Sequence, residues 1–249
     1  MKLKTIYATQ YEGQELSVGD EVTVDGVEHG HAIRTFRLDD GDRCRIINGT
    51  DFWYEAEILT TKREFLTARI LSVNEANTNP TRNLTVFQCM LKSDKMELLL
   101  QKLTEIGVSS FVPVMSRNVV KTGEMKEARA NQIIVEALKQ SGRTTKLELK
   151  KAIDFKQMAK DLKDFDCVFL ANETATKKLG EFGAQIYATM KENARIGLII
   201  GPEGGFDKSE IELLTNLVPQ EKLINYLMCN QILRAETAAI AAASIILLG

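Results

Sequence analysis

Apolar and polar residues follow two different patterns along the chain. In the first part, short runs with alternating apolar positions, such as 21–24 and 65–73, are separated by turn signals at Asp25-Gly26 and Asp40-Gly41. Alternation over so few residues is typical of half-buried β-strands. We therefore expect residues 1–73 to form a small β-barrel or sandwich without a long helix.

The pattern changes after a polar segment with one proline, residues 74–83, which we interpret as a linker. From residue 84 to 249, apolar runs alternate with helical periods, a pattern that predicts a parallel α/β sheet covered on both faces. The expected elements are, in chain order, strand 84–91, helix 94–107, strand 110–115, helix 126–141, strands near 147–150 and 167–170, helix near 176–191, strand 196–200, helix 207–217, strand 222–228 and helix 233–248.

Composition limits the classes of function. The chain has 249 residues, 44% of them hydrophobic, and a formal net charge of -2, so it can form a core but has no overall field that attracts polyanions. The four cysteines are far apart and lack the spacing of metal ligands, so we expect reduced thiols in a cytoplasmic protein and no metal site. The apolar tail 238–248 is too short to span a bilayer, and we expect no membrane partner.

A glycine-rich stretch follows the apolar run 196–200. Gly201, Gly204 and Gly205 lack side chains and Pro202 stiffens the chain, so backbone groups can approach a flat ligand closely. Ligands of parallel α/β sheets bind beyond the carboxyl ends of the strands, where this loop begins. The alternative is a tight strand-to-helix turn without a functional role.

A second unusual segment lies near the carboxyl terminus. A helix rich in alanine, predicted from residue 233, carries its polar residues Arg234, Glu236 and Thr237 in the first turn, where exposed backbone N–H groups also lie. Asp207 and Glu210 are spaced as the capping box of the preceding helix. Arg234 and Glu236 could alternatively be surface charges on a helix that only fills the core.

Several separated motifs resemble one known family. "GPEGGF" (201–206) followed by "ILRAETAA" (232–239) is similar to the family that methylates small-subunit (16S) ribosomal RNA at uridine N3, a branch of the SPOUT superfamily. The other matching segments are "KSDKMELLLQKLTEIGV" (92–108), "EALKQSGR" (136–143) and, similar to the family's PUA-like barrel, "HAIRTFRLDDGD" (31–42).

The resemblance implies a fold and a cofactor. We expect a small PUA-like β-barrel at 1–73 and an α/β domain at 84–249 with a trefoil knot, which forms a homodimer and binds S-adenosyl-L-methionine on three strand-end loops. The matching cofactor-binding positions are Leu170, Asn172, Glu173, Gly201, Pro202, Glu203, Gly204, Met228, Asn230, Ile232, Leu233 and Thr237.

The chemistry of such a reaction can be considered on its own. Methyl transfer to uracil N3 requires alignment of donor and acceptor and removal of a weakly acidic proton. A carboxylate can take the proton and a cation can stabilise the uracil anion. We therefore interpret Arg234 as the cation and Glu203 or Glu236 as the carboxylate; the alternative for each is a structural ion pair or a helix cap.

RNA contacts must come from local basic clusters. Residues 1–73 contain nine Lys or Arg against thirteen Asp or Glu, whereas residues 117–150 contain eight against four. The expected contacts with 16S ribosomal RNA or the small subunit are His31, Arg34, Arg37, Arg43, Arg45, Arg117, Lys121 and Arg143. His31 could instead finish a turn, and the cluster at 117–150 could be a solvated helix face.

The chain departs from the family pattern at 228–231. It has Met-Cys-Asn-Gln where the family has Leu-Gly-x-Arg, so a thiol narrows the cofactor loop and a cation is missing. This departure supports a second hypothesis, a non-catalytic RNA-binding or ribosome-assembly protein on the same fold. A third is a small-molecule α/β enzyme with an added β domain.

Overall fold

The chain folds into two compact units, each of which is described by itself. The computed structural model describes residues 3–76, 78, 80–119, 126–173, 175–176, 178–179 and 193–248. The first unit comprises Met1–Asn79 and Leu138–Lys146, and the second comprises Pro80–Ala137 and Leu147–Gly249.

The first unit is built on a five-stranded sheet in the order β1-β3-β4-β5-β2. Neighbouring strands are antiparallel except β1 and β3, which are parallel. The bounds of its elements are β1 Lys4–Tyr7, the short 3-10 helix η1 Thr9–Tyr11, β2 Glu21–Asp25, α1 Gly26–Arg34, β3 Arg43–Ile47, β4 Phe52–Thr61 and β5 Phe65–Glu75. The runs 21–24 and 65–73, predicted as strands, lie in β2 and β5, and this prediction is confirmed.

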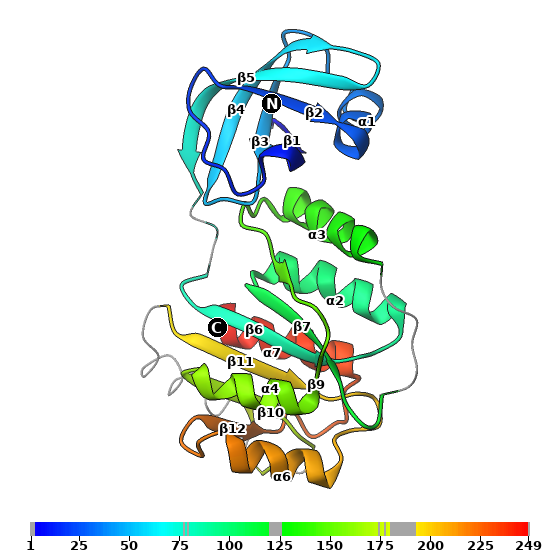
Figure 1. Cartoon of the computed structure of the whole chain (residues 1–249), viewed down its shortest axis with the longest axis vertical. Helices are drawn as coiled ribbons and strands as arrows, with labels where there is room; N and C mark the ends of the chain where they lie inside the picture. Colours follow the sequence, from blue (N-terminus) through cyan, green and yellow to red (C-terminus); the bar gives the residue numbers. More distant parts are fainter. Residues whose placement is uncertain are drawn as a thin grey trace. The chain divides into compact units, whose positions relative to one another are not determined.

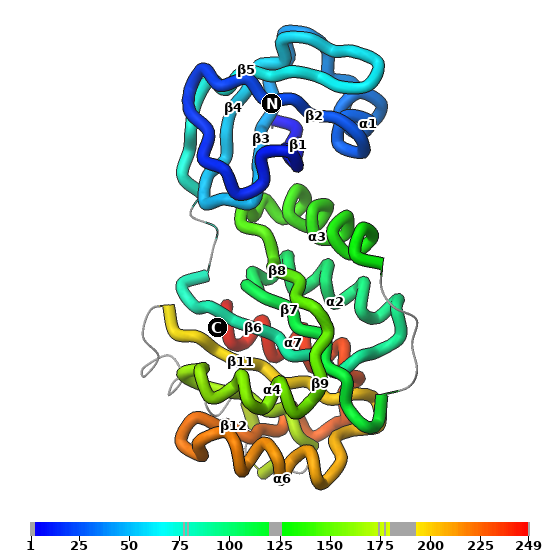
Figure 2. Tube along the Cα trace, in the orientation of Figure 1, coloured from blue at the N-terminus to red at the C-terminus, as the bar shows by residue number. Residues whose placement is uncertain are grey.

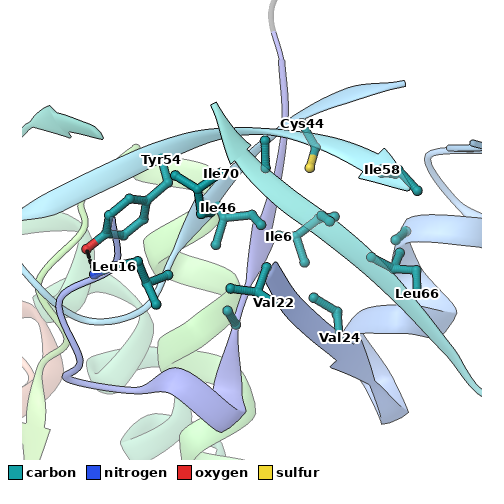
Figure 3. Packing of buried hydrophobic residues seen from close by; sticks show 14 residues of the cluster. Ile6, Leu16, Val22, Val24, Cys44, Ile46, Tyr54, Ile58, Leu66 and Ile70 are labelled. Atoms are coloured by element: carbon teal, nitrogen blue, oxygen red, sulfur yellow. Dashed lines mark hydrogen bonds between the residues drawn. The ribbon is translucent and has the colours of Figure 1, made fainter. Parts of the chain in front are cut away.

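Alternate residues of these strands form the core of the first unit (Figure 3). Ile6, Ile46 and Leu66 are almost fully buried. Tyr54 also lies in this core, and its hydroxyl accepts a hydrogen bond from the backbone N–H of Leu16 at 3.3 Å, which satisfies a polar group that burial would otherwise make costly.

Helix α1 was not expected. The turn predicted at Asp25-Gly26 is the start of this nine-residue helix, with Asp25 as its N-cap. The sequence signal misled because Asp-Gly is common both in turns and at helix starts. In α1, Glu28 and His29 are buried beside residues of the sheet.

The second unit is a seven-stranded sheet covered by helices. The bounds of its elements are β6 Asn83–Cys89, α2 Ser93–Ile106, β7 Ser110–Met115, α3 Glu127–Ser141, β8 Glu148–Leu149, β9 Ile153–Asp154, α4 Phe155–Asp161, η2 Leu162–Asp164, β10 Cys167–Ala171, β11 Arg195–Ile200, α6 Lys208–Leu217, β12 Leu223–Tyr226 and α7 Ala235–Leu248; the last turn of α3 belongs to the first unit. These elements include the predicted strands and helices of the described residues, but β9 and α4 were not expected, and the helix predicted near 176–191 lies largely outside the described residues.

The strand order is β12-β10-β11-β6-β7-β8, and every described pair is parallel. Helices α4 and α6 cover one face with a core that includes Phe155, Met158 and Leu214 (Figure 1). On the other face, α7 packs against α2 and lies on β6 and β11. The parallel sheet predicted from the apolar runs is confirmed.

The path into α7 crosses the sheet. The chain leaves β12 at the edge of the sheet and then places α7 over β6 and β11, strands nearer its middle, as can be followed in Figure 2. This return crossing places α7 beside α2, on the face opposite α4 and α6. It also brings the first turn of α7 toward the first turn of α2.

Candidate functional site

The predicted loops begin at one edge of the parallel sheet. In the pairing register, Leu170 of β10 lies between Ile199 of β11 and Asn225 of β12, and Gln88 of β6 is the partner of Ile200. Because the strands are parallel and in step, the segments after β10, β11 and β12 all leave the sheet at its carboxyl edge.

The Gly201–Gly205 loop has little space for side chains. A Cβ on Gly201 would lie 3.0 Å from the ring of Phe206, and a Cβ on Gly204 would lie 3.3 Å from Asn118. Gly205 has a φ of +69°, and its N–H donates to the carbonyl of Pro202 at 3.0 Å. Close packing and a left-handed turn therefore require glycine here.

Two side chains that the sequence did not single out hold this loop. Asn118 donates to the carbonyl of Gly205 at 3.1 Å, and Gln88 donates to the carbonyl of Gly201 at 3.4 Å. The sequence alone does not indicate this role, because the residue that each side chain contacts lies far away along the chain. Their amides fix the direction of the loop carbonyls.

The end of the loop is fixed by the predicted capping box. Asp207 accepts from the backbone of Ser209 at 2.9 Å, and Glu210 accepts from the backbone of Asp207 at 2.9 Å. Hydrogen bonds from Ser209, with a smaller contribution from the cation of Arg117, hold the pKa of Asp207 below its usual value. Arg117, predicted to bind RNA, forms an ion pair with Asp207 at 3.2 Å.

The predicted carboxylates meet a lysine that was not predicted. Lys95, in the first turn of α2, forms an ion pair with Glu203, and its Nζ lies 3.7 Å from Oε2 of Glu236. The hydrogen bond to Glu203 raises the pKa of Lys95, and Arg234 is close enough to oppose this effect. All three predicted catalytic residues therefore act on one ammonium group.

The remaining predicted positions lie on the flanking loops. Leu170 is buried, Glu173 is exposed, and the backbone N–H of Asn172 donates to the carbonyl of Tyr226 at 2.9 Å. On the segment after β12, Ile232 is 86% exposed. The other predicted positions on that side are the part-buried Met228 and Leu233 and the exposed Asn230 and Thr237.

Several polar atoms at this edge remain unpaired. Gln88 Oε1, Tyr226 Oη and Glu236 Oε2 are buried and have no hydrogen-bond partner among the described residues. Gln88 lies near the carboxyl end of β6, and Tyr226 is the last residue of β12. Buried polar groups normally find partners, so these atoms indicate capacity for a ligand at the edge.

The RNA-binding positions predicted in the first unit differ in accessibility. Arg34, Arg37 and Arg43 are exposed, and Arg43 forms an ion pair with Glu55 at 3.0 Å. Arg45 lies on the same strand as Arg43, and its guanidinium stacks over Trp53 at 4.8 Å. Burial lowers its pKa.

His31 and Arg143 lie in less accessible surroundings. His31 stacks on Phe36, and its Nδ1 lies 3.1 Å from Nζ of Lys139. Arg143 is only 6% exposed, and burial lowers its pKa to about 10. The RNA contact expected of Arg143 stays a prediction, and Lys121 lies outside the described residues.

The described residues form neither a metal cluster nor a membrane-spanning helix. In the described part of the chain, no three His, Cys, Asp or Glu side chains are grouped so as to hold a metal ion. None of the helices described is both long and apolar enough to cross a bilayer. The four cysteines are free thiols, and burial raises the pKa of Cys44, Cys89 and Cys167 to about 12.

Comparison with known proteins agrees with this geometry. The profile of a family described as "RNA methyltransferase domain" matches residues 77–247, and that of an "RNA methyltransferase PUA domain" matches residues 30–71. A solved structure of ribosomal RNA small subunit methyltransferase E from Neisseria gonorrhoeae, bound to S-adenosyl methionine, superimposes with a TM-score of 0.82 at 22% identity, over 97% of this chain and 95% of that one. The fold is therefore that of an α/β-knot RNA methyltransferase of the SPOUT class with a PUA-like barrel, as predicted.

Sequence relatives define the family more closely. Ribosomal RNA small subunit methyltransferase E of Rickettsia conorii is 30% identical over 98% of this chain and 96% of the relative. The protein of that name from Bacillus subtilis is 26% identical over 96% of this chain and 94% of the relative. The chain belongs to the family of ribosomal RNA small subunit methyltransferase E.

Proposed function

We propose that this protein transfers a methyl group from S-adenosyl-L-methionine to N3 of a uridine in 16S ribosomal RNA of the small subunit. The observation that carries the proposal is the convergence, at the carboxyl edge of a parallel sheet, of the close-packed Gly201–Gly205 loop with Glu203, Glu236 and Lys95. The names of the relatives support the choice of substrate.

The residues at the edge fit the cofactor. The loop after β11 would hold it through backbone groups, because Gly201 and Gly204 bear no side chain and pack closely against Phe206 and Asn118. The segments 170–173 and 228–237 would hold its other sides, and the unpaired atoms Gln88 Oε1 and Tyr226 Oη offer further hydrogen bonds. When bound, S-adenosylmethionine supplies an electrophilic methyl group, whose bond to sulfur breaks as the bond to N3 forms.

The chain's own residues contribute alignment, charge and a proton acceptor. Glu203 or Glu236 would take the N3 proton, and Arg234 would stabilise the negative charge that develops on the uracil. General base catalysis of this kind contributes roughly 10²- to 10⁴-fold in rate. Asn118 and Gln88 would keep the loop in place during the reaction.

We assign the parts of the chain to separate tasks. Residues 1–73 are the PUA-like RNA-binding domain, 74–83 the linker and 84–249 the methyltransferase domain. The exposed Arg34, Arg37 and Arg43 support phosphate contacts from the first of these, and Arg117 supplies a contact from the last. We also propose a cytoplasmic homodimer, for which the reduced cysteines and the exposed Ile232 are the supporting features.

The test uses the full chain with labelled S-adenosylmethionine. It is incubated with small subunits, or with naked 16S RNA, from a strain that lacks the corresponding gene, and the modified nucleotide is mapped by mass spectrometry. We expect one 3-methyluridine in the small-subunit RNA.

Two other outcomes would change the assignment. Cofactor binding by calorimetry without transfer of label would favour the second function, a non-catalytic RNA-binding or ribosome-assembly protein, which the Met-Cys-Asn-Gln sequence at 228–231 supports. If the protein neither binds the cofactor nor transfers label to RNA, the proposed enzymatic function is wrong.

A further inference from the structure

Three distant parts of the chain converge on Lys95. Lys95 lies in the first turn of α2, Glu203 in the loop after β11 and Glu236 in the first turn of α7. Glu203 is 108 residues from Lys95 along the chain. The single ammonium group thus connects the predicted cofactor loop to the helix that carries Glu236.

Lys95 and Glu236 are more shielded from water than Glu203, which lies at the surface. The side chains of Lys95, Glu203 and Glu236 are 19%, 35% and 11% exposed. Charges that are partly removed from water are screened less by salt than exposed ones. The matched ion pair on the same helix, Lys102 with Glu105, has the more exposed lysine, at 38%.

The formal charges around Lys95 balance when Arg234 is counted with the two carboxylates. Lys95 faces the carboxylates of Glu203 and Glu236, and the cation of Arg234 acts on it from the start of α7. Oε2 of Glu236 has no hydrogen-bond partner among the described residues, so it can accept a hydrogen bond, and then a proton, from a substrate.

We propose that Lys95 is a positioning residue for methyl transfer, which holds Glu203 and Glu236 together so that Oε2 of Glu236 accepts the N3 proton. The proposal rests on the proposed function. In the step, the proton moves from N3 of the uracil to Glu236, and the electron pair of N3 forms the bond to the methyl carbon. The methyl–sulfur bond breaks with its electron pair left on sulfur, and Glu236 later releases the proton to water.

The experiment compares Lys95→Met with Lys102→Met in the full chain. Methylation of small-subunit RNA is measured as kcat and KM from pH 5 to 9, and cofactor affinity is measured by calorimetry. We expect Lys95→Met to lower kcat about 100-fold, in the range of a lost proton acceptor, while cofactor affinity changes less than about threefold. Lys102→Met should behave as wild type.

Two further readouts separate positioning from a structural role. The acid limb of the kcat profile should move to higher pH in Lys95→Met, because a carboxylate without its neighbouring cation takes up a proton more readily. Lys95→Arg keeps the cation and should recover most of the lost rate. Glu236→Gln, which is close in shape, should lower kcat at least as much as Lys95→Met.

Several results would contradict the proposed role of Lys95. Equal losses of kcat and cofactor affinity, with an unchanged pH profile, would show that Lys95 is only structural, and activity of Lys95→Met equal to that of Lys102→Met would also overturn the proposal. If Lys95→Met does not fold, Lys95→Arg with low kcat and Glu236→Gln with full kcat overturn it by themselves. Wild-type protein that transfers no label would overturn the proposed function and this proposal with it.

Discussion

Two shielded lysines, one in each unit, show how differently a similar ion pair can be used. In the first unit, Lys139 pairs with Glu28 at 2.6 Å, and the other oxygen of Glu28 accepts from the backbone N–H of Tyr7 at 2.9 Å. Both carboxylate oxygens therefore have partners. In the second unit, Lys95 faces two carboxylates, and one oxygen of Glu236 has no hydrogen-bond partner in the described structure.

The difference separates stability from chemistry. A buried pair whose hydrogen bonds are all made fixes the chain but leaves no group that can act on a ligand. A cluster with unused hydrogen-bonding capacity costs stability and is retained where that capacity is needed. We therefore expect the lysine of the first unit to matter for folding and Lys95 to matter for turnover.

Removing Lys139 should give the largest effect on stability. Lys139→Met leaves the buried carboxylate of Glu28 without its cation, which should cost about 3–5 kcal/mol in the free energy of unfolding. Urea titration followed by fluorescence of the single tryptophan, Trp53, reports on the first unit because Trp53 lies in β4. Glu28→Gln combined with Lys139→Met should recover part of the loss. Equal losses in the free energy of unfolding for Lys95→Met and Lys139→Met would contradict the expected difference between the two lysines.

Filling the glycine loop should have the next largest effect. The added methyl group of Gly201→Ala would lie 3.0 Å from the ring of Phe206, and overpacking of this kind costs about 1–3 kcal/mol. We expect cofactor affinity, measured by calorimetry, to fall about tenfold or more. Gly205→Asn, whose Cβ would meet nothing within 4 Å and whose residue type tolerates positive φ, should have a smaller effect. A larger loss in Gly205→Asn would contradict the steric explanation.

Weakening the helix cap behind the loop should have the smallest effect. Asp207→Ala should lower the Tm by about 2–4 °C at neutral pH, as the loss of an N-cap does. Because the pKa of Asp207 is lowered in the folded state, its contribution is present above the unfolded pKa of about 3.9 and is lost as pH falls through the folded value. The difference in Tm between variant and wild type should therefore shrink below pH 4.

The matched control for this cap is Asp154→Ala. Asp154 caps α4 by accepting from the backbone of Gln157 at 2.7 Å, away from the loop. It should lower the Tm without changing cofactor affinity, whereas Asp207→Ala should change both. Identical affinities for the two variants would show that the cap of α6 does not set the loop.

Local features of the fold could be predicted well. The capping box of Asp207 and Glu210 formed as expected, and the helix predicted over 94–107 ends with Gly107 as its left-handed C-cap, at a φ of +106°. Such features depend on residues within one or two turns of each other. Helix α1 was missed because its start resembles a turn and its nine residues are too few for a clear helical period.

The candidate site could be predicted only in part. The glycine loop and the polar first turn of α7 carry their signals in neighbouring residues. No such local signal marks Lys95, Gln88 or Asn118. Each of these side chains contacts the loop 201–205, which lies far away along the chain and is brought near only by the order of the strands. The burial of Arg143 could not be predicted either, since composition gives the number of charges in a segment and not the side on which they lie.

By itself, therefore, the sequence determined the alternation of strands and helices, the caps and the loop that must be free of side chains, because hydrophobic period and backbone conformation are local properties. The tertiary structure decided which charges meet. The parallel order β10-β11-β6 and the return of α7 across the sheet bring Glu203 and Glu236 to Lys95. A contact over such separations depends on how the elements pack, which no short stretch of sequence encodes.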